Sequence, residues 1–68
     1  QWEDDRLYWA VDMGPEGAGI CMVSSTQLEP LCQETGSPHI DSFSADNHTV
    51  YASIDPQPLQ WQIAQLPF

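Results

Sequence analysis

The sequence predicts a mainly β protein, a small antiparallel sheet or open barrel of about five strands with one short helix. Runs of apolar and aromatic residues with the length of strands alternate with clusters of Gly, Pro, Asp and Asn that favour turns. The 68 residues give room for a single domain, residues 1–68, with a modest core. A hydrophobic fraction of 41% is too high for a disordered segment, so we expect the chain to fold.

The chain begins with an acidic segment that carries one tryptophan. Glu3, Asp4 and Asp5 follow Trp2 directly. Three consecutive acidic side chains favour solvent, which predicts a solvated arm or the start of a strand. Trp2 is then either a lid over the core or an exposed anchor for a partner.

Residues 6–13 and 18–23 form the first predicted hairpin. Both segments are rich in aromatic and branched side chains, and the Gly-Pro-Glu-Gly sequence of residues 14–17 suits a four-residue turn. The register that places Trp9 opposite Met22 makes both faces of the hairpin apolar. We expect such a hairpin at the centre of the domain, unless one of its faces binds a partner.

The segment that begins at Thr26 fits a short helix, with Gly36 as a natural stop. Thr26 can cap it, with Glu29 three positions later, and the proline in this segment keeps it short. A helix packed on the first hairpin brings Cys32 towards Cys21, which predicts a disulfide between the two. The alternative is a pair of buried, reduced thiols in a cytosolic protein.

Residues 39–45 and 48–54 form a second predicted hairpin around Asp46 and Asn47, which tolerate a tight turn. One face of this hairpin is mostly apolar and the other is a Ser/Thr/Tyr surface that includes Ile40. A proline-rich connector leads to alternating apolar residues that predict an edge strand over residues 59–66.

The charge of the chain is strongly acidic. Ten Asp and Glu residues face a single basic residue, Arg6, so the formal net charge is −9. Such a charge argues against direct binding of nucleic acid and disfavours anionic membranes. No apolar stretch reaches the ~20 residues of a membrane span. A basic protein surface remains a suitable partner, and the alternative is that the charge only keeps the domain soluble.

The sequence contains the residue types of a hydrolytic triad in His39, Asp41 and Ser42. Neighbouring side chains of a strand point to opposite faces, so contiguous residues do not converge on one substrate. His48 lies near the opposite end of the hairpin from His39, which weakens a metal site. We therefore predict no catalytic residue, no metal and no cofactor. Asn47 starts an Asn-His-Thr sequon, a match that is frequent by chance.

A binding site is predicted at the ends of the chain, where large apolar residues lie beside acidic ones. Trp9 and Trp61 are expected in the core. The alternative for the two ends is that they pair with each other over the core. The predicted partner-binding residues are Trp2, Glu3, Asp4, Asp5, Tyr8 and Phe68.

Together these features predict a non-enzymatic, secreted or periplasmic protein-binding module, or a subunit of a larger extracytoplasmic assembly. Its partner is another protein chain, either basic or a second copy of itself. The alternative is an inhibitor or immunity-type protein that neutralises a basic enzyme such as a lysozyme or nuclease, steered by the −9 charge. Gln1 is not a translation start, which fits a processed exported protein and equally a fragment.

Overall fold

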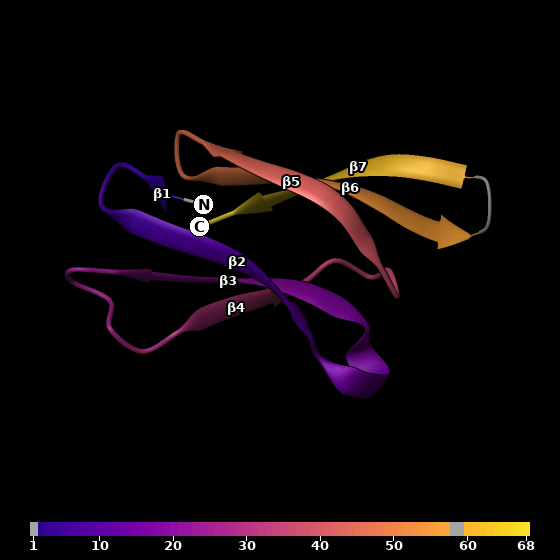
Figure 1. The fold of residues 1–68 in the computed structure, drawn as a ribbon, viewed down its shortest axis with the longest axis horizontal. Coiled ribbons are helices and arrows are strands. Elements are labelled where there is room, and N and C mark those ends of the chain that lie inside the picture. The colour runs from indigo at the N-terminus through magenta and orange to yellow at the C-terminus, as the bar shows by residue number, and fades with distance from the viewer. Residues whose placement is uncertain (1, 58–59) are drawn as a thin grey trace.

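The computed structural model describes residues 2–57 and 60–68, which form two small antiparallel sheets stacked on each other (Figure 1). The first sheet has the strand order β1-β2-β3-β4 and the second β5-β6-β7. A short 3-10 turn, η1 (Gly14–Glu16), joins β2 to β3. The prediction of a mainly β fold is confirmed. The strands are β1 (Trp2–Glu3), β2 (Arg6–Asp12), β3 (Ala18–Ser24), β4 (Leu31–Glu34), β5 (Ile40–Asp46), β6 (Thr49–Gln57) and β7 (Gln60–Pro67).

The core lies between the two sheets and draws one face from each. Side chains alternate between the two faces of a strand, so every second residue of the central strands points inwards. Three further apolar residues, Ile40, Phe43 and Phe68, are partly buried and pack against this core. The buried cluster consists of Tyr8, Ile20 and Met22 from the first sheet and Ala45, Val50 and Leu66 from the second.

The first hairpin pairs one residue away from the predicted register. Trp9 lies opposite Cys21, and Tyr8 lies opposite Met22. A slip of one residue exchanges the two faces of a strand. Tyr8 therefore enters the core and is fully buried, whereas Trp9 lies on the other face and is half-buried.

The difference in register arises in the turn, which is one residue longer than predicted. Residues 13–17 connect the paired strands. The Met13 N–H donates to the Gly17 carbonyl at 2.7 Å, and the Gly17 N–H donates to the Gly14 carbonyl at 2.9 Å. Gly14 and Gly17 have φ angles of 68° and 88°, which few other residues adopt.

The helix predicted after Thr26 is wrong, because residues 25–30 form a loop and residues 31–34 form the strand β4. β4 forms hydrogen bonds with β3 and places Cys32 directly opposite Cys21. Pairing on the open edge of β3 satisfies backbone groups that a single helical turn would leave unpaired. The side-chain oxygen that orders the loop belongs to Ser24, which accepts the Gln27 N–H at 3.0 Å.

The second hairpin turns at Asn47 and His48, one residue later than predicted. Both residues have positive φ angles, 50° and 63°, as a two-residue hairpin turn requires. The inward and outward sets of side chains are nevertheless those predicted, except near the start of β5. A bulge between Ile40 and Ser42 turns Ile40 towards the core rather than the polar face.

A buried serine fixes the connection between the two sheets. Ser37 is 1% exposed, and its hydroxyl donates to the His39 carbonyl at 2.8 Å and accepts the Asp55 N–H at 3.3 Å. The Ser37 carbonyl accepts the Ala18 N–H at 2.8 Å. A Cβ atom at Gly17 would lie only 2.6 Å from this carbonyl oxygen, so the crossover passes where only glycine fits.

Candidate partner-binding surface

The face of the first sheet that points away from the core is largely apolar. Trp2 lies opposite Leu7, and Leu7 lies opposite Val23, so the three side chains share this face. Trp2 is 68% exposed, whereas the other apolar residues of the face are half-buried. We call this surface the first-sheet outer face. It comprises Trp2, Leu7, Trp9, Val11, Val23 and the two cysteines.

A disulfide between Cys21 and Cys32 lies in this face, as the sequence predicted. The two Cα atoms are 4.0 Å apart on directly opposed positions of β3 and β4. Cys21 is buried and Cys32 is exposed. The bond ties the short edge strand β4 to the centre of the sheet, beside Trp9.

Acidic residues border the first-sheet outer face. Glu3, Asp4 and Asp5 lie in β1 and in the turn to β2, directly after Trp2. The Asp5 carboxylate accepts the Ser25 N–H at 3.3 Å and also the Ser25 hydroxyl, which holds this turn against the loop between β3 and β4. Seven of the ten acidic residues precede β5, namely Glu3, Asp4, Asp5, Asp12, Glu16, Glu29 and Glu34.

Of the other two residues predicted to bind a partner, Tyr8 lies in the interior and Phe68 is partly buried against the core. Tyr8 is fully buried, and the ring of Phe68 packs edge-on against it at a centroid distance of 5.4 Å. The Phe68 N–H donates to the His48 carbonyl at 2.8 Å, and the Arg6 guanidinium donates to the Phe68 main-chain oxygen at 2.8 Å. Trp2 thus lies at one end of the first-sheet outer face, with Asp4 and Asp5 in the turn that follows. Glu3 pairs with Arg6 and alternates to the opposite face, on which Tyr8 also lies, and Phe68 packs against Tyr8.

The prediction that Trp61 lies in the core is wrong, because Trp61 is 59% exposed. In β7 the residues that face inwards are Ala64 and Leu66, opposite Ala52 and Val50 of β6. Trp61 and Ile63, which is 64% exposed, alternate with them and point outwards. The alternation predicts that the set with Trp61 and Ile63 is buried, whereas the structure buries the set with Ala64 and Leu66.

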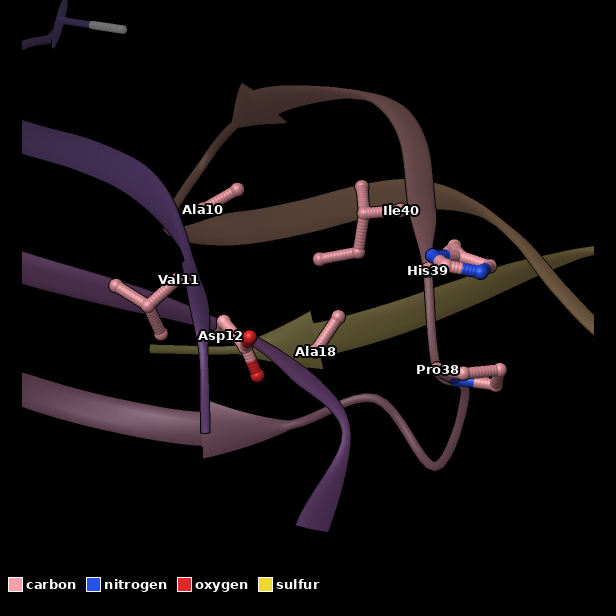
Figure 2. Close-up of a pocket in the computed structure, with 7 residues that line it drawn as sticks. All are labelled: Ala10, Val11, Asp12, Ala18, Pro38, His39 and Ile40. Carbon is pink, nitrogen blue, oxygen red and sulfur yellow. The ribbon is translucent and has the colours of Figure 1, made fainter. Parts of the chain in front are cut away.

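A shallow hollow of about 350 Å³ opens between the two sheets, where the end of β2 faces the start of β5 (Figure 2). Its two ionisable side chains are Asp12 and His39. Asp12 accepts the Gly14 N–H at 2.9 Å, and His39 is exposed. The hollow is otherwise lined by Ala10, Val11, Ala18, Pro38 and Ile40.

The residues considered for catalysis lie at the start of β5. His39 precedes the strand, Asp41 lies in its bulge, and Ser42 follows and pairs with Ser53, all three exposed to solvent. Among the residues that the structure describes, no group of three or more His, Cys, Asp or Glu side chains is arranged to hold a metal ion. Asn47 is exposed at the hairpin turn.

The described part of the chain has no helix of the length and apolarity that crossing a membrane requires. Comparisons with protein-family models, with curated proteins and with solved structures give no significant match to this chain.

Proposed function

We propose that the protein is a non-enzymatic, extracytoplasmic protein-binding module that docks on a basic protein through the first-sheet outer face. The observation that carries the proposal is the position of Trp2, a large side chain that is 68% exposed on an apolar face bordered by acidic residues. An apolar centre with a polar rim is the usual anatomy of a protein interface, and tryptophan is enriched among the residues that contribute most to binding.

The rigidity of this face supports the proposal. The disulfide and the hydrogen bonds between neighbouring strands of the first sheet hold the apolar side chains in place before any partner binds. A face that is already ordered loses little conformational entropy on binding, so more of the contact energy appears as affinity. Trp2 can then act as an anchor in a pocket of the partner, and the half-buried residues around it can exclude water.

The charge indicates the class of partner. Acidic residues near Trp2 attract a basic surface and accelerate its association, while they repel acidic surfaces and phosphate backbones. An inhibitor or immunity-type protein is the special case in which the basic partner is an enzyme such as a lysozyme or nuclease. Loss of the enzyme's activity in the complex distinguishes an inhibitor from a module that binds without effect on catalysis.

The disulfide supports the proposed location outside the cytoplasm. Structural disulfides persist in oxidising compartments and are rare in the cytosol. The bond between Cys21 and Cys32 is compatible with a secreted or periplasmic protein, and both cysteines are used in it.

A pair of tryptophan variants tests the proposed surface. Binding to a cationic lysozyme and to a basic ribonuclease is measured by calorimetry for the wild type, Trp2→Ala and Trp61→Ala. Trp61 is exposed to a similar extent but lies on the second sheet, so it is the matched control. We expect Trp2→Ala to weaken binding at least about tenfold and Trp61→Ala to change it less than about twofold.

The salt dependence of the same complexes tests the role of charge. We expect the association rate to fall steeply as ionic strength rises from roughly 0.05 to 0.5 M, because salt screens attraction between exposed charges. Equal effects of the two tryptophan variants, or complexes that are indifferent to salt, would contradict the proposal.

A further inference from the structure

The second sheet ends in a strand, β7, that is touched at its C-terminal end by the Gln33 side chain, which donates to the Pro67 carbonyl, and that has no second strand beside it in the described chain. β7 is the last strand in the order β5-β6-β7, so one side of its backbone has no strand partner in the described chain. It is eight residues long and contains no charged residue. An exposed, uncharged edge strand of this length is a template for pairing with another strand.

The other edges of the two sheets carry features that discourage such pairing. β1 has two residues and is followed by Asp4 and Asp5, and β4 has four residues and ends in Glu34. β5 contains a bulge, carries Asp41 and Asp46, and contacts β1. Short strands, bulges and charges are the means by which soluble proteins protect their edges. Of the residue types that discourage strand pairing, β7 contains only a proline, Pro67, at its end.

We propose that two copies of this chain pair through β7, antiparallel, into one continuous six-stranded sheet. The strand meets its own copy across a twofold axis, so the contact is used once by each copy and the assembly closes as a dimer. A register that places Trp61 of each copy opposite Ile63 of the other joins the two large apolar side chains of β7 that are exposed. An aromatic residue opposite a β-branched one is a favourable cross-strand pair.

The distribution of charge leaves this edge open to a second copy of the chain. Each copy carries −9, so the two repel each other except where the acidic residues are distant. Seven of the ten acidic residues precede β5, and the segment from residue 56 to residue 68 has none; the acidic residue nearest to this contact is Asp55, on β6 beside the end of β7 that carries Trp61. Figure 1 shows that β6 and β7 extend beyond the other strands at one end of the molecule, which lets a second copy approach β7 clear of the first sheet.

This dimer is independent of the proposed docking surface. It uses the second sheet and leaves the first-sheet outer face of both copies free. The two contacts respond to salt in opposite directions. Salt screens the repulsion between two acidic copies and strengthens the dimer, whereas it weakens the attraction of the acidic rim for a basic partner. The two proposals therefore fail separately.

Sedimentation velocity of the whole chain tests the dimer over roughly 10 µM to 1 mM, the range in which small interfaces dissociate. The variant Ile63→Asp places a charge in the contact, and Ser44→Asp places the same charge on β5, at the far edge of the same sheet. We expect a concentration-dependent dimer that moderate salt strengthens, at least tenfold weaker dimerisation in Ile63→Asp, and little change in Ser44→Asp.

Amide hydrogen exchange of the wild type gives a second measurement that does not depend on a variant. Protection of alternate β7 amides should rise with protein concentration, while the amides of β5 should not change. A monomer at every concentration, equal effects of the two variants, or growth beyond the dimer would overturn the proposal.

Discussion

Removal of the disulfide between Cys21 and Cys32 is the perturbation whose effect follows most directly from the structure. The bond closes a loop with a sequence separation of 11. In the chain-entropy description, a loop of this length reduces the entropy of the unfolded chain by about 9 cal/mol/K, or about 2.8 kcal/mol at 25 °C. Domains of this size have a total stability of roughly 3–10 kcal/mol. The bond therefore supplies a large share of the free energy of unfolding.

Equilibrium urea unfolding of the wild type and of a Cys21→Ala/Cys32→Ala variant measures this share. We expect the variant to lose about 2–3 kcal/mol, and the melting temperature to fall by roughly 10–20 °C. Wild-type protein in reductant is the control that keeps every side chain except the bond. Because β4 has only four residues on the edge of its sheet, its amides should lose protection from hydrogen exchange before those of β2. A loss below about 1 kcal/mol, or a β4 that stays protected, would refute this account.

Two further substitutions test how the chain passes from one sheet to the other. Gly17→Ala should destabilise the protein by at least about 1 kcal/mol more than Gly14→Ala in urea unfolding, because both positions have positive φ but only Gly17 faces a carbonyl oxygen at 2.6 Å. Equal losses would mean that backbone strain alone matters. Ser37→Ala should cost about 1–3 kcal/mol, since it deprives the Asp55 N–H and the His39 carbonyl of a buried partner. Unchanged thermal stability would show that water replaces the hydroxyl.

The features that the sequence predicted are those set by local chemistry. Aromatic and branched runs separated by turn residues indicate strands whatever their partners, which is why the mainly β class is confirmed. The disulfide was also predictable, because two cysteines allow a single pairing. The predicted route to it through a helix was wrong, since Cys32 reaches Cys21 from a neighbouring strand.

The register of the first hairpin was not predictable from the pattern of side chains. Register is normally set by which face is apolar, and here both faces are. The choice then depends on the turn, and Met13 joins the turn rather than the strand. The register also determines which residues form the candidate site. It places Tyr8 rather than Trp9 in the core, so Trp9 lies with Trp2 on the outer face.

The first-sheet outer face is apolar because both faces of the first hairpin are apolar. A strand pair that is apolar on both sides needs cover on both sides, as in the centre of a larger domain. The described strands supply one covering layer, the second sheet, and the core forms only there. The opposite face keeps Leu7, Val11 and Val23 half-buried by their neighbours and leaves Trp2 exposed. The proposed partner would complete the cover of this face, and Trp2 is the side chain that would gain most from it.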